Sequence, residues 1–454
     1  MLTATETSAS TEATQEHGQQ AGELSSPAAG DQKPLPLWRN LQFQTLWLGQ
    51  SASTLGVAVA DIAYPLAILA ITGSPARAGL FAAVQATGML VAGLPAGSLA
   101  DRYDSRKIAI GAEACRALIT CVVVIALVRG WPSLALLLSA AALLGAGQAI
   151  SGAARMLLVR AVVPASQLTR ALTQDEIRMN GSALVGPALG GALYGVHALA
   201  HAVPFLFTAG CFVLAVTTAT VMKLLPGGAA PVAPVADRPV GQSTAGPDKP
   251  ADRTVRDNDM LAGLRTLWRE PVLRAAMLLI MAVNTVGAGL DLAIIVLLRH
   301  QHIPSGTIGL ALGIGAVGGL AGAPLVKALH RINPGVLLFL VSFELVLIFA
   351  LLALPFGPWW TAGLVFVSML GVPAIRVLVD ILVLRQAPTE VRGRVVAAVM
   401  MLVGLGIPVG TGAVGLLLQY LPAEMAVLTL AAVLAVVVGF CCTNRTLWRA
   451  RWPQ

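Results

Sequence analysis

The sequence predicts an all-α membrane protein in which twelve transmembrane helices form two pseudo-symmetric bundles of six. Of its 454 residues, 56% are hydrophobic and only 11% are charged, whereas soluble domains carry about 25% charged residues. The apolar residues gather in runs long enough to cross roughly 30 Å of hydrocarbon as helices. A polar, proline-rich segment divides these runs into two groups of equal number.

Apolar runs that end at charged residues, prolines or glycines mark the predicted spans. The first six cover residues 44–72, 78–100, 108–128, 132–152, 179–198 and 203–223. The second six cover residues 273–298, 306–329, 334–354, 359–384, 395–419 and 422–442. Each is long enough to cross a bilayer as one helix.

Composition also predicts the domain boundaries. Residues 1–36 are rich in Ser, Thr, Ala, Glu and Gln, which favours a disordered cytosolic tail over a signal peptide. Residues 37–223 form the predicted N-terminal bundle, and residues 259–443 form the C-terminal bundle. Between them, residues 224–258 contain six prolines and predict a flexible cytosolic linker. Residues 444–454 complete the chain as a second cytosolic tail.

The basic residues predict the orientation in the membrane. Of the thirty Lys and Arg residues, only Arg77, Arg129 and Arg299 fall in connections from an odd to an even span. Positive residues stay on the cytosolic side, so both termini are expected to be cytosolic. This asymmetry explains the net charge of +8 better than nucleic-acid binding does. The bias toward Ala, Val, Gly, Leu and Arg is typical of a high-GC bacterium, so we expect a multi-pass protein of a bacterial cell membrane.

The two halves of the sequence repeat each other. A shift of 230 residues along the chain places Gly79 on Gly309, and the same shift places Asp61 on Asp291. Internal repeats of this kind are typical of secondary transporters.

The connection between spans two and three, GSLADRYDSRK, concentrates charge directly after a glycine. Gly97 lacks a side chain, so a neighbouring helix can approach its backbone closely. Asp101, one turn later, can accept from Arg102 or face the positive N-terminus of another helix. Arg106 and Lys107 hold the loop on the cytosolic side. The alternative is a solvated loop that is retained only for topology.

These residues, the two groups of six spans and the central linker resemble the major facilitator superfamily. The segments FQTLWLGQSASTLG, QAPTEVRGRV and GPALGG are most similar to its bacterial drug-exporter branch, which includes macrolide and siderophore exporters. In the family motif a second glycine and a further basic residue stand where this chain has Asp104 and Ser105. The resemblance implies that the loop contacts span eleven near Val395 and latches the cytosolic side in the outward-facing state.

Span five carries a motif similar to one associated with antiporters of this superfamily. Its residues are Ser182, Gly186, Pro187, Gly190 and Gly191. The glycines give a flat face for close packing and the proline bends the helix, so packing without any bearing on transport is the alternative reading. A second antiporter-associated pattern, an Arg in span four before a Gln-Gly pair, is absent, although Gln148 lies near that place.

Two acidic residues inside apolar spans are the candidates for proton coupling. Asp61 in span one and Asp291 in span seven occupy repeat-equivalent positions. Charged groups in hydrocarbon are costly, which makes each a functional candidate. The resemblance implies that both face the central cavity from opposite halves. There each carboxyl group can be neutral when desolvated and charged when wetted. The alternative is an acid that bonds to a neighbouring Ser or Thr and never titrates.

For other charged residues inside the spans, a structural role is one interpretation. Arg376 and Asp380 in span ten can pair along one helix face, either as a structural ion pair or as a gate element. Glu113 and Arg116 in span three can also pair, and for them and for Glu344 in span nine we expect a structural role.

The sequence therefore predicts a secondary transporter, not an enzyme, that exports small amphipathic organic molecules by alternating access, with proton antiport as the energy source. No motif indicates a cofactor, a metal site or ATP hydrolysis. We expect a monomer in the lipid bilayer whose partners are protons and a small-molecule substrate, and a role in antibiotic resistance fits such an exporter. The alternatives are an importer or uniporter of the same fold and a transport-inactive membrane sensor.

Overall fold

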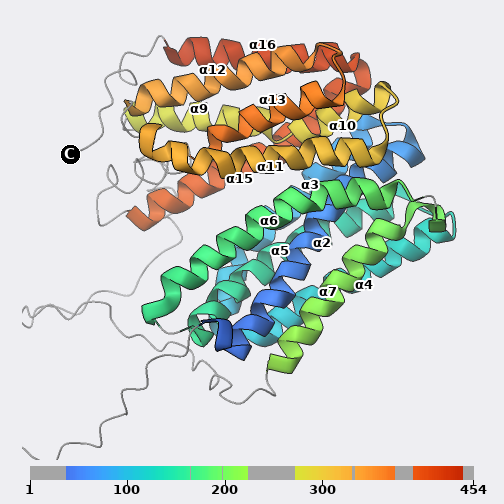
Figure 1. The fold of residues 1–454 in the computed structure, drawn as a ribbon, viewed down its shortest axis with the longest axis vertical. Helices are drawn as coiled ribbons and strands as arrows, with labels where there is room; N and C mark the ends of the chain where they lie inside the picture. The colour runs from blue at the N-terminus through green and yellow to red at the C-terminus, as the bar shows by residue number, and fades with distance from the viewer. Residues whose placement is uncertain are drawn as a thin grey trace, which may run out of the picture.

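A computed structural model describes residues 37–163, 165–196, 198–222, 271–329, 333–373 and 392–442. Every regular element in these ranges is a helix, and ten helical segments in them are long and apolar enough to cross a membrane. Figure 1 shows two bundles, one blue to green from the N-terminal half and one yellow to red from the C-terminal half. The predicted fold class is therefore confirmed.

The N-terminal half contains six long helices. They are α2 (Leu41–Thr72), α3 (Pro75–Arg102), α4 (Ser105–Val128), α5 (Leu134–Val162), α6 (Leu168–Tyr194) and α7 (Val203–Val221). Three short 3₁₀ turns accompany them, η1 (Leu37–Arg39), η2 (Ala165–Gln167) and η3 (Ala198–His201). Helix α6 begins well before the predicted residue 179, because its first turns carry charged side chains that the apolar pattern does not include.

The C-terminal half contains the elements that follow residue 270. They are α9 (Pro271–Gly287), α10 (Leu290–His300), α11 (Ser305–Leu329), α12 (Pro334–Leu352), α13 (Pro358–Leu370), α15 (Arg392–Tyr420) and α16 (Ala423–Cys442). The predicted single helix over residues 273–298 is wrong in one respect, because it is broken at Ala288 and Gly289. A Cβ atom at Gly289 would collide with Val414 of α15, so the close approach of α15 requires glycine here.

The two halves repeat the same helix contact. Helix α3 packs on α5, and a Cβ atom at Gly88 would collide with the backbone of Ala142. Helix α11 packs on α13 in the same way, with Gly318 against the backbone of Phe366. The shift that places Asp61 on Asp291 also places Gly88 on Gly318, so the structure repeats as the sequence does.

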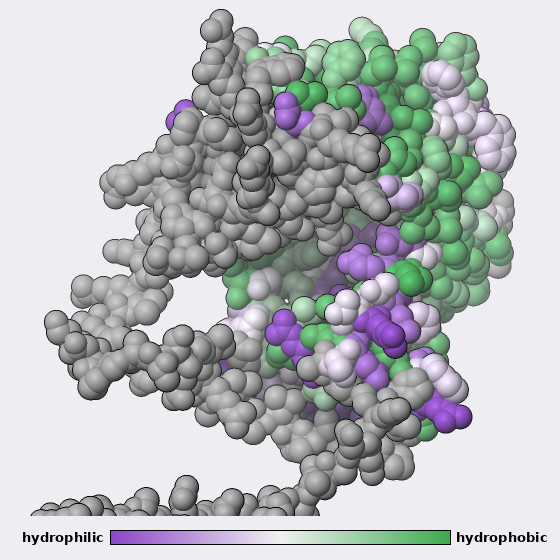
Figure 2. All heavy atoms as spheres, turned by 60° about the vertical axis from the view of Figure 1, so that its left-hand side comes forward, coloured by the Kyte–Doolittle hydropathy of each residue, from purple (hydrophilic) through white to green (hydrophobic). Residues whose placement is uncertain are grey.

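The halves meet tightly at one end of the molecule, called the closed end below. There the Ser74 hydroxyl donates a hydrogen bond of 2.5 Å to the Gln419 side chain. The Arg299 guanidinium donates one of 3.0 Å to the carbonyl oxygen of Leu66. In Figure 1, α6 and α11 run together toward the right and separate toward the left. Figure 2, which brings that left side forward, shows a hollow between the halves at this open end.

Candidate functional site

Asp61 and Asp291 lie on the boundary between the two halves. Asp61 is in the apolar stretch of α2, and Asp291 is in the first turn of α10, where a helix N-terminus favours negative charge. Both side chains are accessible to solvent, and they are near enough to each other to interact electrostatically. The structure thus brings together two carboxylates that come from opposite halves of the sequence.

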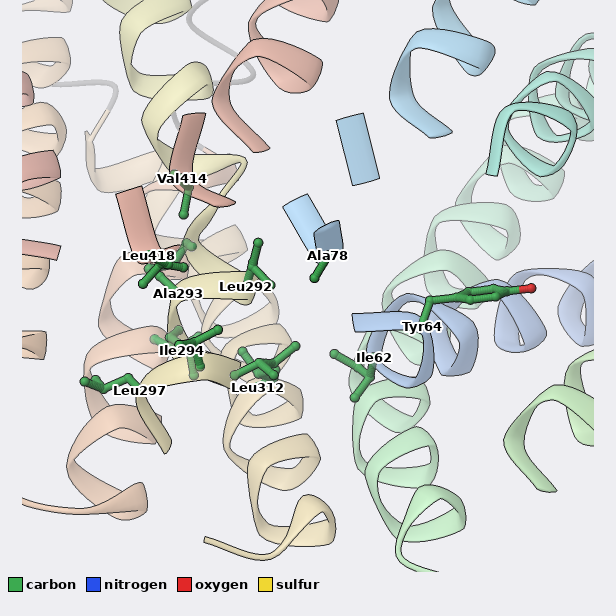
Figure 3. Packing of buried hydrophobic residues seen from close by; sticks show 14 of the residues in the cluster. Ile62, Tyr64, Ala78, Leu292, Ala293, Ile294, Leu297, Leu312, Val414 and Leu418 are labelled. Carbon is green, nitrogen blue, oxygen red and sulfur yellow. The ribbon is translucent and has the colours of Figure 1, made fainter. Parts of the chain in front are cut away.

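A hydrophobic seal adjoins the two acids. Figure 3 shows Ile62 and Ala78 of the N-terminal half facing Leu292 and Leu312 of the C-terminal half. All four side chains are buried and belong to one hydrophobic cluster that spans both halves. The seal therefore joins the halves beside the position of the two carboxylates.

A small polar cavity lies beside Asp61, inside the N-terminal half. Its volume is about 10 Å³, which suits a single water molecule. Its polar lining residues are Asp61, Tyr64, Gln85, Arg116, Thr120, Gln148 and Thr208. The Gln85 side chain is within hydrogen-bonding reach of the Asp61 carboxylate. The Tyr64 ring points away from the C-terminal half (Figure 3) and stacks on Phe81 at 4.5 Å.

A buried ion pair borders this cavity. Arg116 contacts Glu113 at 3.1 Å, and the predicted pairing of these two residues is confirmed. The hydroxyl groups of Ser53 and Ser151 donate hydrogen bonds to the same carboxylate, at 3.0 Å and 2.6 Å. The Arg116 guanidinium also lies 4.1 Å from the centre of the Phe212 ring.

Arg116 stands between two acids. It is paired with Glu113 and interacts electrostatically with Asp61 across the small cavity. Gln148 of α5 lines the same cavity, so Arg116 of the neighbouring helix α4 places a guanidinium near it. Sequence reasoning missed this link, because Arg116 belongs to a different span.

A larger cavity, of about 340 Å³, lies inside the C-terminal half. Its lining residues are Val283, Asn284, Gly287, Ala288, Leu290, Val341, Glu344, Leu345, Ser368, Met369, Val372 and Ile407. It therefore opens beside the break between α9 and α10, and α12, α13 and α15 complete its wall. We call it the Glu344 cavity, because Glu344 is the one charged residue among the described residues that line it.

The Glu344 carboxylate has no counter-ion in the described part of the chain. The ion pairs there are Arg116 with Glu113 and Arg178 with Asp175. Nor does any described residue form a hydrogen bond with Glu344, which is half-buried. Sequence reasoning assigned it a structural role, yet it lines a cavity of about 340 Å³. The signal that could have found it is the internal repeat, because the shift that places Asp61 on Asp291 places Glu113 directly beside Glu344.

The charged loop after α3 lies at the open end. An added Cβ atom at Gly97 would have no neighbour within 4 Å. Arg106 donates hydrogen bonds of 2.7 Å to the carbonyl oxygens of Ala219 and Thr220 at the end of α7. Asp104, the departure from the family motif, accepts from the Arg106 backbone N–H at 2.9 Å and so caps the N-terminus of α4.

The other residues of the loop motif take no part in these contacts. Arg102 and Lys107 are exposed. The side chain of Asp101 and the side chains at the start of span eleven lie outside the described residues, as do Arg376 and Asp380. The cytosolic latch and the gate pair therefore stay predictions.

The span-five motif packs on both halves of the molecule. Gly186 faces Ala58 of α2, and Gly191 faces Gly309 of α11, with the backbones in direct contact. Ser182 is buried on the same helix. A Cβ atom at Gly190 would lie 2.7 Å from the Val59 carbonyl oxygen. The motif, including Pro187, thus sits where α6 joins the N-terminal half to α11.

These features describe a chamber between two bundles that is closed at one end and open at the other. In the described ranges, no three His, Cys, Asp or Glu side chains converge in a way that could hold a metal ion. The two carboxylates at the boundary of the chamber are groups that can take up a proton or bind a cationic group.

Comparison with known proteins places the chain among transporters. The family profile described as Major Facilitator Superfamily matches residues 46–411. An uncharacterized MFS-type transporter, YfiS of Bacillus subtilis, is 27% identical over 88% of this chain and 93% of its own length. The enterobactin exporter EntS of Citrobacter koseri is 24% identical over 78% of this chain and 79% of its own. Macrolide efflux protein A of Streptococcus pyogenes is 27% identical over 40% of this chain and 45% of its own.

Solved structures share the fold at low sequence identity. A bacterial homolog of the human lysosomal transporter Spinster, in an inward-facing conformation, superposes with a TM-score of 0.66. It is 13% identical, and the match covers 91% of this chain and 98% of that one.

Proposed function

Because this chain belongs to the Major Facilitator Superfamily, we propose that it is a secondary transporter that exports small amphipathic organic molecules in exchange for protons. It is a multi-pass membrane protein, as its ten apolar helical segments and its family require. Export is favoured by similarity to relatives named as macrolide and enterobactin exporters. We expect it to work as a monomer in a bacterial cell membrane, with both termini in the cytosol.

One observation carries the proton-antiport proposal. Asp61 and Asp291 lie on opposite sides of the boundary between the two halves, near enough to interact electrostatically. Two nearby carboxylates disfavour double ionisation, so a proton or a cationic group on one of them is favoured. Substrate and proton would therefore compete for the same pair, which is what an exchanger needs.

The proposed cycle uses both ends of the chamber. In the proposed orientation the open end of the chamber faces the cytosol, so water would reach the acids from that side and a proton could leave. When the closed end opens to the outside, the acids are protonated from there and release substrate. Each proton that enters the cell gains about 2.3 kcal/mol per 100 mV of membrane potential.

The loop and motif residues have proposed roles in the same cycle. Gly97, Asp101 and Arg102 would contact span eleven and hold the cytosolic side shut in the outward-facing state. The contact of Gly191 with Gly309 would hold the outer side shut in the inward-facing state.

A susceptibility panel in an efflux-deficient bacterial host tests this function. The panel compares wild type, Asp61→Asn and Asp291→Asn against macrolides, cationic dyes and catecholate siderophores, with equal amounts of protein in the membrane. We expect wild type to protect against at least one compound and both variants to lose that protection. If both variants protect as well as wild type, the two acids are not the coupling site.

A further inference from the structure

The two halves carry a carboxylate at adjacent positions of the internal repeat and surround it differently. Glu113 lies within α4 and Glu344 within α12, and the internal repeat brings the two to adjacent positions. Glu113 is buried, paired with Arg116 and bonded to two serine hydroxyls. Glu344 has no such partner in the described part of the chain and faces a cavity instead.

We propose that the Glu344 cavity binds an amphipathic organic cation, whose charged group takes the place that Arg116 takes beside Glu113. In the N-terminal half the counter-charge is part of the chain, and the space around it is only about 10 Å³. In the C-terminal half the space is about 340 Å³, within the range of cavities that hold small organic ligands.

The lining of the cavity fits this class of ligand. Most of its residues are aliphatic, so it favours a ligand with a large apolar part. The Asn284 amide N–H donates to the Ile280 carbonyl at 3.0 Å, and the Ser368 hydroxyl donates to Val365 at 2.7 Å. The Ser368 donor and one of the two Asn284 N–H donors are therefore used within the protein, and both side-chain oxygens remain as acceptors. A carboxylate beside acceptor oxygens favours a cation over an anion.

The break between α9 and α10 in span seven also favours a binding site at the Glu344 cavity. Gly287 and Ala288, at the end of α9, line the cavity, and Asp291 follows in the first turn of α10. Discontinuous helices often form binding sites in transporters, because the freed backbone groups face the cavity. A ligand at Glu344 would contact the same helix break that positions the proposed coupling acid. The role in export rests on the proposed function, whereas the binding itself does not.

Binding to the purified full-length protein in detergent tests the proposal. The probes are methyltriphenylphosphonium, a cation, and methyltriphenylsilane, a neutral molecule of the same shape and nearly equal size. Equilibrium dialysis measures the affinity of each. We expect Glu344→Gln to weaken phosphonium binding about tenfold or more, because a charged pair is lost, and to leave binding of the neutral probe unchanged. The retained neutral binding shows that the variant is folded.

Two further variants complete the design. Ala288→Leu fills the cavity and should weaken both probes, and Glu424→Gln removes an acid of the same half outside the cavity and should weaken neither. Absence of saturable phosphonium binding by wild type, or equal phosphonium affinity in wild type and Glu344→Gln, would overturn the proposal. So would unchanged binding of both probes by Ala288→Leu.

The same assay separates this proposal from the proposed function. Phosphonium binding in detergent needs no proton gradient. Loss of affinity in Glu344→Gln, combined with resistance that is independent of Asp61, would support the site and refute the antiport. Resistance that depends on Asp61, combined with unchanged affinity in Glu344→Gln, would do the reverse.

Discussion

The N-terminal half packs closely around the buried carboxylate of Glu113, whereas the C-terminal half leaves a cavity beside the carboxylate of Glu344. In the first, Glu113 pairs with Arg116 and accepts hydrogen bonds from Ser53 and Ser151. In the second, Glu344 faces an apolar cavity at a broken helix. Two halves of the same fold can therefore differ in role. One can hold a fixed ion pair in its core, while the other can leave a cavity that is large enough for a ligand.

The two acids on the boundary, Asp61 and Asp291, also differ in their surroundings. Asp61 shares a small polar cavity with Arg116, so a fixed positive charge lies near it. The structure describes no basic side chain in an ion pair with Asp291. We therefore expect changes in the two halves to have unequal effects, as follows.

The largest effect is expected from Arg116→Met. It leaves Glu113 buried without its counter-ion, and breaking such a pair costs about 3–5 kcal/mol. Denaturant titration in mixed micelles measures the free energy of unfolding. Glu344→Gln is the matched change in the other half, and it should leave that free energy unchanged or raise it, because no pair is broken.

The double variant Glu113→Gln with Arg116→Met sharpens this contrast. It should recover part of the stability that Arg116→Met loses, because no uncompensated charge stays buried. Equal losses in Arg116→Met and Glu344→Gln would show that the halves do not differ in this way.

A smaller effect is expected from adding one methyl group in each half. A Cβ atom at Gly147 would lie 2.7 Å from the Arg116 side chain, whereas one at Gly287 would have no neighbour within 4 Å. Overpacking costs about 1–3 kcal/mol, so Gly147→Ala should destabilise the protein by that amount. Gly287→Ala should stabilise it by about 0.4–1 kcal/mol, because the unfolded chain loses freedom. The same titration measures both, and a destabilised Gly287→Ala would contradict the open packing of the C-terminal half.

The smallest effect is expected where the halves touch. Arg299→Ala removes the hydrogen bond to the Leu66 carbonyl, which is worth about 1 kcal/mol, so opening of the closed end should become about fivefold more frequent. The measurement is the rate at which an impermeant maleimide labels Leu312→Cys from outside, in a cysteine-free background. Leu312 is buried in the seal of Figure 3.

Arg77→Ala is the control for this experiment. Arg77 is exposed near the same end, and no ion pair in the described part of the chain includes it. It should leave the labelling rate unchanged. An equal increase in both variants would mean that Arg299 does not hold the halves together.

Much of the fold follows from the sequence alone. Apolar runs of membrane-spanning length predict the helices, and the shift that relates the two halves predicts that Gly88 and Gly318 make equivalent contacts. The same shift identifies Asp61 and Asp291 as partners, because inner-facing acids in a repeat occupy equivalent places.

The remainder depends on contacts between residues far apart in the chain. The glycine at position 289 is required by the close approach of Val414, a residue far away in the sequence. Glu344 lies in one of the most apolar spans, and only the spaces left by four other helices make it a cavity residue. Arg116 reaches Gln148 and Asp61 across helices, so the apolar pattern of its own span predicts only its pairing with Glu113.

Proteoliposomes test the role of Asp61 most directly. The substrate is the compound against which wild type protects best, and two modes are measured, transport driven by a pH gradient and exchange of labelled for unlabelled substrate without one. We expect Asp61→Asn to lose gradient-driven transport and to retain exchange, because a side chain that stays neutral cannot carry the proton. Gradient-driven transport by Asp61→Asn at the wild-type rate would contradict coupling at this carboxylate.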